Sequence, residues 1–407
     1  MWFSYGYFVM LPNGIAVPSG HDFGTTPDTY KVGSSMGVRD GKEGIVVAVV
    51  KGAEAKRNGF DVLVLIVENE PGTLVPSVPS AEAIERAIRG LNAVPTPPHT
   101  IHAVVKDQRF IAVWNRLYRR PATETFHEFL IEVPLKGTFG RAWYQEQLKK
   151  PEPQRHAVEQ WLRSFREQQQ KYRPPGHKGG EVYAAPATGA TKELMALAHD
   201  LYLLQKSKSL PRPLVRRLRN YKEFQGARYE IAVAAAFVKC GFDIEWITDV
   251  KSRHPEFVAR NKRTGEEIAV ETKSRRRPGA LHESGVLPPE DKLRADVEAL
   301  YDDALEQDPG DKPFAVFLDV NLPPNAAPEE TVKWRDEVVG RWRENQQEIA
   351  LLGFTNFSWH YKAGESVSRP ELLFTVPISS ARPLRTPETL RCLQVVLASY
   401  GVVNNEY

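Results

Sequence analysis

The sequence predicts an α/β protein with a mixed sheet flanked by helices and, before it, a strand-rich α/β part. Two observations support this prediction. Short apolar runs of strand length alternate with segments whose apolar residues recur at helical spacing. Between about residues 210 and 325 these segments follow the order α-β-β-β-α-β. With 407 residues, 42% hydrophobic and 26% charged, the chain has the composition of a globular protein of two or three domains.

Residues 1–138 are predicted to form an accessory α/β domain in which strands outnumber helices. Residues 80–91 have the spacing of a helix, with Ser80 as its N-cap. No phosphate-binding loop, zinc-ligand spacing or nucleophile elbow occurs here, so this part shows no chemistry of its own. The expected strands cover residues 44–50, 60–67, 101–105, 110–114 and 126–133.

Residues 139–182 are expected to be a helical spacer followed by a linker. Residues 153–172 are polar, with apolar side chains at helical spacing, which predicts a helix. Residues 174–180 are rich in Pro and Gly and break that pattern. The remaining residues, 183–407, form the predicted main domain.

The main domain is expected to mix helices and strands. Gly241 marks the end of its second helix, and residues 262–265 have the composition of a hairpin turn. Residues 313–321 are almost continuously apolar, which predicts a buried strand. The expected helices cover 191–204, 213–240 or 221–240, 291–306 and 329–352, and the expected strands cover 242–248, 256–261, 267–274, 313–321, 358–362 and 372–377.

Charge, cysteine content and hydropathy exclude several classes of protein. The net charge is only +3, so affinity for nucleic acid would depend on local basic patches. Cys240 and Cys392 cannot build a disulfide framework and lack the spacing of metal ligands, which favours a reducing cytoplasm. No apolar run is long enough to cross a bilayer and the first residues make a poor signal peptide, so no membrane partner is expected.

The strand predicted at 267–274 carries two charged side chains that call for an explanation. Because side chains alternate along a strand, Glu271 and Lys273 project from one face, while the other face is largely apolar. Glu256 opens the neighbouring strand, and antiparallel pairing across the hairpin would bring it beside Glu271. Two close carboxylates repel each other unless a cation lies between them, and Mg²⁺ or Mn²⁺ suits such oxygen ligands. Lys273 would then orient a metal-bound water or neutralise charge on a phosphate.

Other interpretations of the same residues stay open. Glu271 and Lys273 could form an ordinary surface salt bridge, which contributes little to stability. If the strand register differs, Asp249 could take the place of Glu256, and His254 could also contribute.

Together with the order of elements, Glu256 and Glu271-Thr272-Lys273 resemble the motif of the PD-(D/E)xK nuclease superfamily, which has the restriction-endonuclease-like fold. That family often adds a glutamate on the preceding helix, and residues 226–234 fit this pattern with Glu230. The resemblance covers residues 210–325 and implies a catalytic site of Glu256, Glu271, Lys273 and Glu230, in which the three glutamates bind the metal. Glu256 stands where the family usually has Asp, so its longer side chain would need a different rotamer to reach the metal.

Basic residues lie on both sides of this motif in the sequence. Residues 206–222 contain several Lys and Arg side chains and no acidic one. Such side chains contact phosphates and supply affinity that does not depend on base sequence. The candidates for binding nucleic acid are Arg216, Arg217, Arg219, Arg275, Arg276 and Arg277.

The sequence therefore predicts a cytoplasmic, metal-dependent endonuclease that hydrolyses phosphodiester bonds of DNA. A role in defence or DNA processing is suggested only by analogy with the superfamily. The alternatives are a catalytically inactive nucleic-acid-binding module of the same fold and an RNA-directed nuclease. Because many nucleases of this fold cut both strands as dimers, a homodimer is a further hypothesis.

Overall fold

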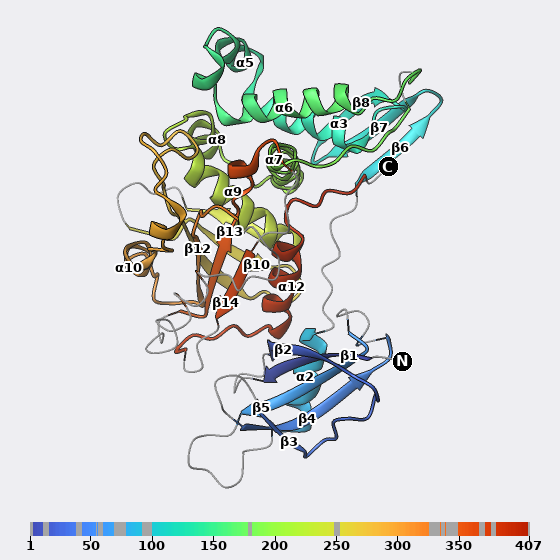
Figure 1. Ribbon diagram of the computed structural model, residues 1–407, viewed down its shortest axis with the longest axis vertical. Helices are drawn as coiled ribbons and strands as arrows, with labels where there is room; N and C mark the ends of the chain where they lie inside the picture. The colour runs from blue at the N-terminus through green and yellow to red at the C-terminus, as the bar shows by residue number, and fades with distance from the viewer. Residues whose placement is uncertain are drawn as a thin grey trace. The chain divides into compact units, whose positions relative to one another are not determined.

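The computed structural model describes most of the chain and divides it into two compact units (Figure 1). The first unit holds residues 1–95 and 383–395, and the second holds 96–382 and 396–407. The predicted boundaries at 138 and 182 therefore both fall inside the second unit. The described residues are 3–10, 16–37, 43–53, 55, 60–68, 79–91, 100–177, 181–247, 253–324, 334, 338, 349–365, 371–375 and 380–405.

The first unit contains a five-stranded sheet with strand order β2-β1-β5-β4-β3. Its strands are β1 (Phe3–Met10), β2 (Ala16–Gly24), β3 (Ser35–Gly37), β4 (Glu43–Lys51) and β5 (Val62–Glu68), and its helix is α2 (Ala81–Leu91). Phe8, Leu63 and Leu65 pack with Ala87 of α2 in one apolar core cluster. The predicted N-cap is confirmed, because the hydroxyl of Ser80 accepts a hydrogen bond from the backbone N–H of Ala83 at 3.2 Å.

The second unit begins with a small antiparallel sheet and a group of helices. The elements are β6 (Ile101–Val105), β7 (Gln108–Val113), β8 (Arg116–Pro121), α3 (Phe126–Leu130), η2 (Ile131–Leu135), α4 (Lys136–Phe139), α5 (Arg141–Leu148), η3 (Glu152–Gln154) and α6 (Ala157–Lys171). The prediction of a strand at 126–133 is wrong. Thr125 and Glu128 form a capping box that starts a helix there, and Phe126 and Phe129 are buried at helical spacing.

The six-stranded sheet of the second unit has the strand order β14-β13-β12-β11-β10-β9. Strands β11, β12 and β13 are parallel to one another, and the other neighbouring pairs are antiparallel. From α9 to β12 the elements follow the predicted order α-β-β-β-α-β. The elements are α7 (Gly189–Lys206), α8 (Arg212–Arg219), α9 (Phe224–Lys239), β9 (Phe242–Trp246), β10 (Phe257–Asn261), β11 (Glu267–Ser274), η4 (Glu290–Lys292), α10 (Glu298–Leu305), β12 (Phe314–Asp319), β13 (Leu351–Asn356), η5 (Trp359–Lys362) and β14 (Glu371–Thr375). Helix α12 (Pro387–Ala398) starts among the residues of the first unit and ends in the second.

Helices cover both faces of this sheet around β11. On one face, Phe237 of α9 packs edge-on against the rings of Phe257 and Phe317. On the other face, Ala269 of β11 shares a core cluster with Ala304 of α10. Because both faces are covered, any charged side chain in the middle of β11 is removed from water.

Three other predicted elements differ from the structure. The helix expected at 291–306 is shorter, since η4 precedes α10. The helix expected at 329–352 is wrong at its end, where Leu351 and Leu352 pair with β12 as a strand, and most of its residues lie outside the described part. The strand expected at 358–362 is the 3₁₀ helix η5. In the described part of the chain, no helix combines the length and apolar character needed to span a membrane.

Candidate active site

The hairpin of β10 and β11 brings two carboxylates together, as the alternation of side chains predicts. Phe257 pairs with Val270 in the antiparallel ladder, so Glu256, one residue before β10, lies near Glu271, and their charges interact. The backbone N–H of Glu256 donates to the carbonyl oxygen of Val270, the register partner of Phe257, at 3.0 Å, so the two strands stay hydrogen-bonded at the point where the regular register ends. The tight turn after β10 fixes the register, since the side-chain oxygen of Asn261 accepts from two backbone N–H groups of that turn.

A third carboxylate joins the pair from helix α9. Glu230 is buried on α9, and its carboxyl lies close enough to Glu256 for the charges to interact. We call Glu230, Glu256 and Glu271 the carboxylate group. Burial and then the negative charge of Glu256 raise the pKa of Glu271 to about 8, and the same two causes raise the pKa of Glu230 to about 8. These carboxylates are therefore held together at a cost in electrostatic energy.

Lys273 supplies the positive charge that the sequence predicted beside Glu271. Its Nζ lies 3.0 Å from Oε1 of Glu271 as an ion pair, although the angles of approach do not make a hydrogen bond. The Lys273 side chain is 22% exposed, whereas Glu271 is fully buried. The lysine therefore connects the buried carboxylate with the solvent side of the site.

Gln307, just beyond α10, completes this arrangement and was missed in the sequence. In the amide orientation that satisfies its neighbours, Gln307 donates to Oε2 of Glu271 at 2.8 Å and to the carbonyl oxygen of His254 at 2.6 Å. Its amide oxygen accepts from Nζ of Lys273 at 2.6 Å. No motif marks a glutamine at the end of a helix, so only the packing of α10 on β11 reveals it.

Arg217 of α8 lies on the other side of the carboxylate group. Its two terminal nitrogens donate to the two carboxylate oxygens of Glu230, at 2.7 and 2.6 Å. The sequence assigned Arg217 to phosphate binding because it lies in a basic stretch. The structure places it against the carboxylate group instead.

The other arginines expected to bind nucleic acid fall into two sets. Arg216, Arg219 and Arg276 are exposed. Arg275 is partly buried and pairs with Asp296 at 2.9 Å, and Arg219 donates to the carbonyl oxygen of Thr138.

Arg277 corrects the prediction more sharply, because it is buried and faces the interior. Its guanidinium donates hydrogen bonds to the carbonyl oxygens of four residues at the ends of β12 and before α10. Because the Arg277 guanidinium is buried and engaged by these carbonyls, it has a structural role and is not available to a phosphate.

The carboxylate group fits a divalent cation, judged by its donor atoms. Oε1 of Glu271 is buried and has no hydrogen-bond donor, and Glu256 supplies a second carboxylate close to that of Glu271. Hard oxygen donors that repel each other are the ligands that Mg²⁺ and Mn²⁺ take. Within the described ranges, no cluster of three or more His, Cys, Asp or Glu side chains converges as a ready-made metal site. Asp249, the alternative to Glu256, lies outside the described residues, and His254 is partly buried with Nδ1 2.9 Å from the carbonyl oxygen of Pro255.

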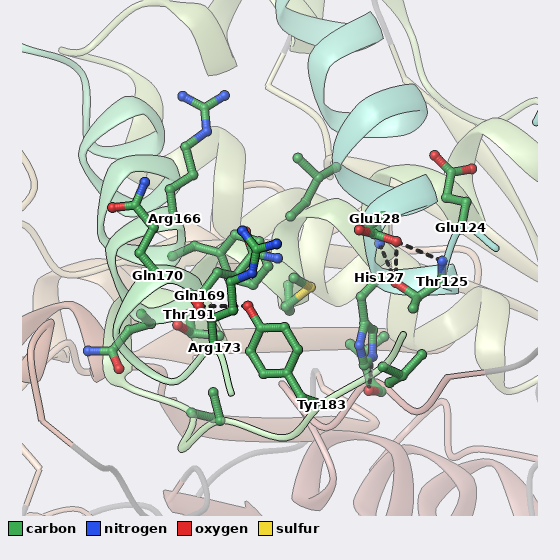
Figure 2. A pocket seen from close by; sticks show the side chains of 18 of the residues that line it. Glu124, Thr125, His127, Glu128, Arg166, Gln169, Gln170, Arg173, Tyr183 and Thr191 are labelled. Carbon is green, nitrogen blue, oxygen red and sulfur yellow. Dashed lines mark hydrogen bonds between the residues drawn. The ribbon is translucent and has the colours of Figure 1, made fainter. Parts of the chain in front are cut away.

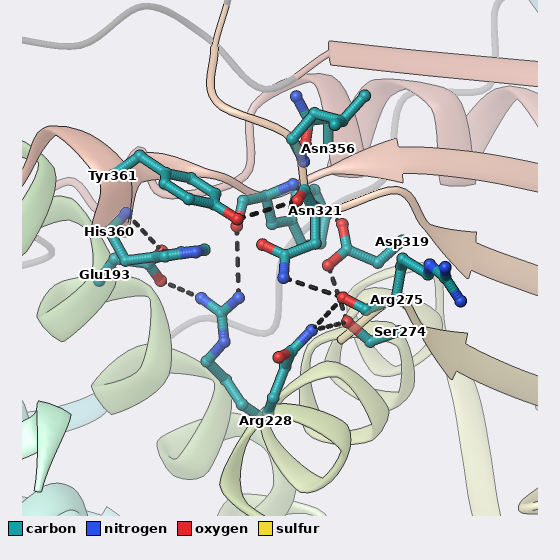
Figure 3. A network of polar contacts seen from close by, with 12 residues as sticks. Glu193, Arg228, Ser274, Arg275, Asp319, Asn321, Asn356, His360 and Tyr361 are labelled. Atoms are coloured by element: carbon teal, nitrogen blue, oxygen red, sulfur yellow. Dashed lines mark hydrogen bonds and ion pairs between the residues drawn. The ribbon is translucent and has the colours of Figure 1, made fainter. Parts of the chain in front are cut away.

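A second group of buried charges lies where β12 and β13 end, and we call it the polar network (Figure 3). Arg228 of α9 forms an ion pair with Glu193 of α7, and Nδ1 of His360 lies 3.1 Å from the other oxygen of Glu193. Burial alone would raise the pKa of Glu193, but Arg228 and His360 together hold that pKa below its usual value. Asp319 accepts hydrogen bonds from Ser274 and other groups around it, so its carboxylate is also satisfied.

The second unit also contains a cavity of about 850 Å³ among α3, α6, α7 and residues 181–187 (Figure 2). Buried Leu162 and Met195 form part of its wall, and the labelled side chain of Tyr183 lies within it. Glu128, also on its wall, is already engaged by the backbone N–H of Thr125 at 2.8 Å. None of the described residues that line the cavity belongs to the carboxylate group, so the cavity is separate from the candidate site.

Comparison with known proteins found no family model, no curated protein and no solved structure that matches this chain. Function is therefore inferred from the site alone.

Proposed function

We propose that the protein is a metal-dependent nuclease that hydrolyses phosphodiester bonds of DNA. The observation that carries this proposal is the meeting of Glu256, Glu271 and Lys273 at the β10–β11 hairpin. The order of elements from α9 to β12 agrees with the order that the resemblance to the PD-(D/E)xK superfamily implies. Glu256 and Glu271 would hold Mg²⁺ or Mn²⁺ between them.

A bound cation would supply an acidified water and would neutralise charge on the phosphate. Lys273 is partly exposed and held 3.0 Å from Glu271, so its ammonium can donate to a water or a phosphate oxygen at the site. The amide oxygen of Gln307 accepts a hydrogen bond from that ammonium and so limits the directions in which its other N–H groups point. The buried environment strengthens each of these interactions because little water competes with them.

Exposed arginines support nucleic acid as the substrate. Arg276 follows Lys273 closely in the sequence, and Arg216 is one residue before the arginine that contacts Glu230. Their charges would attract the phosphate backbone that the carboxylates repel. DNA is the proposed target, and RNA is tested beside it.

The test compares cleavage of plasmid, single-stranded DNA and RNA by the full chain with Mg²⁺, Mn²⁺ or EDTA. Glu271→Ala and Lys273→Ala should each reduce the rate by at least about 100-fold, because each removes a group that touches the reacting atoms. Glu267→Ala is the matched control, since Glu267 lies on the same strand but pairs with Arg260 at 2.6 Å. Metal-independent cutting, or full activity in both site variants, would contradict the proposal. Retention of nucleic acid without cleavage would favour the inactive binding module.

A further inference from the structure

Arg217 engages Glu230 more completely than any other cation engages a carboxylate in the described part of the site. Separate nitrogens donate to separate oxygens, at 2.7 and 2.6 Å. Glu230 is only 3% exposed, while the Arg217 side chain is 37% exposed, so the guanidinium lies on the solvent side of the carboxylate. Such two-point pairing fixes the plane of both groups.

Helix α8 holds Arg217 in this position. Leu214 and Leu218 are buried and anchor one side of α8, which leaves Arg217 directed toward α9. Glu223, in the turn between the two helices, lies 3.9 Å from Nε of Arg217 and adds a weaker attraction. The pairing of Arg217 with Glu230 is therefore built from two helices and does not depend on a loop.

The charges of the site divide unequally among its members. Lys273 is paired with Glu271 and Arg217 is paired with Glu230. When all three carboxylates are ionised, two cations leave one negative charge uncompensated, and Glu256 acts on both of the other glutamates. One cation between Glu256 and Glu271 would compensate this charge, whereas a second cation at Glu230 would have to displace the guanidinium.

We infer that Arg217 takes the place of a second metal ion, so that the site binds a single divalent cation through Glu256 and Glu271. The guanidinium is a permanent positive charge that cannot be deprotonated in a protein, which makes it a stable substitute. Glu230 then acts as the anchor of Arg217 and is not a metal ligand. This inference rests on the metal site of the proposed nuclease, but it is tested by metal binding and not by cleavage.

The experiment is isothermal titration of Mn²⁺ into the full chain at about pH 8, where metal binding releases fewer protons from Glu271 than at neutral pH. The wild type should bind one Mn²⁺ per chain. Arg217→Gln keeps a polar side chain but removes the charge and releases Glu230. It should therefore bind Mn²⁺ on the order of tenfold more tightly, or bind a second ion. Arg216→Gln removes the same charge from the same helix without touching Glu230 and should change affinity by less than about twofold.

A charge-neutral double variant, Arg217→Gln with Glu230→Gln, keeps the inference falsifiable if the single variant folds poorly. It should bind one Mn²⁺ with nearly wild-type affinity, because both proposed ligands are intact. Two Mn²⁺ ions in the wild type, no Mn²⁺ at all, unchanged or weaker binding by Arg217→Gln, or a tenfold loss in the double variant would each overturn the inference. If the wild type binds one Mn²⁺ as described but cleaves no nucleic acid, the proposed function fails and the inference about Arg217 stands.

Discussion

The carboxylate group and the polar network are built from the same kinds of side chain, yet they handle charge in opposite ways. Helix α9 contributes to both, with Glu230 in the carboxylate group and Arg228 in the polar network. Two residues apart on a helix, these side chains face different sides. Arg228 and His360 share one carboxylate, that of Glu193, whose pKa is lowered despite burial. In the carboxylate group the pKa of Glu271 is raised to about 8, although Lys273 is beside it.

Both regions contain carboxyl groups with a raised pKa, but the causes of the increase differ between them. In the polar network, burial raises the pKa of Asp319, and no like charge adds to this shift. For Glu271 and Glu230, the charge of Glu256 is the second cause after burial. Repulsion that the fold preserves between neighbouring carboxylates is characteristic of sites that bind a cation or move a proton. The comparison therefore supports a structural role for the polar network and favours the carboxylate group as the site of the proposed chemistry.

The largest expected effect tests whether the polar network stabilises the fold. Arg228→Met removes the cation from a fully buried pair and leaves Glu193 without its main partner. The free energy of unfolding should fall by about 3–5 kcal/mol, as measured by urea denaturation. Arg217→Gln, which removes a partly exposed guanidinium, should cost much less. Equal losses in the two variants would show that Arg217 is as structural as Arg228 and would break the comparison.

The second expected effect concerns the carboxylate group and the pH dependence of the free energy of unfolding. Glu271 has a pKa of about 8 in the folded protein against 4.5 as its ordinary value. Between these values the folded state binds more protons than the unfolded chain, so stability is greatest below pH 4.5 and falls as pH rises to about 8. At pH 7 and without metal, the raised pKa of Glu271 lowers the free energy of unfolding by about 3 kcal/mol. Glu271→Gln should therefore be more stable than the wild type by roughly that amount.

Urea denaturation in EDTA at acidic and at mildly alkaline pH measures this difference. The gain from Glu271→Gln should be large at alkaline pH and nearly absent at acidic pH. Saturating Mn²⁺ should reverse the order of the two proteins, because only the wild type has both ligands for the ion. A gain that does not depend on pH would mean that the pKa of Glu271 is the same in the folded and the unfolded protein, so that neither burial nor repulsion acts on it.

The sequence predicted the backbone of the site better than its side-chain partners. The strand at 267–274 was predicted with its observed bounds, because strand alternation and a hairpin turn are local signals. The partners of Glu230 and Glu271 depend on how α8 and α10 pack, which no local pattern encodes. Arg277 illustrates the limit, since an arginine that follows an exposed one in the sequence is buried among carbonyl groups. One missed signal was local: the capping box of Thr125 and Glu128 could have identified the helix at 126–130.

The smallest expected effect concerns Gln307, which joins Glu271 and Lys273 without carrying charge. Gln307→Leu keeps much of the volume but removes the donor to Oε2 of Glu271. The ionised carboxylate loses a hydrogen bond, so the pKa of Glu271 should rise and the acidic limb of the kcat profile should move to higher pH by a fraction of a unit. The kcat should fall on the order of tenfold, while KM for DNA should stay nearly constant, because no phosphate contact changes.

Glu306→Gln is the matched control for this variant, since Glu306 is the neighbouring residue and pairs with Arg253 outside the site. A lower kcat with an unmoved pH profile would reduce Gln307 to a packing residue. A moved profile would show that the amide of Gln307 shifts the pKa of Glu271. The carboxylates of the polar network are already paired and do not depend on such a donor. The two regions would then differ in their dependence on pH as well as in their charges, because only the carboxylate group would respond to the loss of a neutral hydrogen-bond donor.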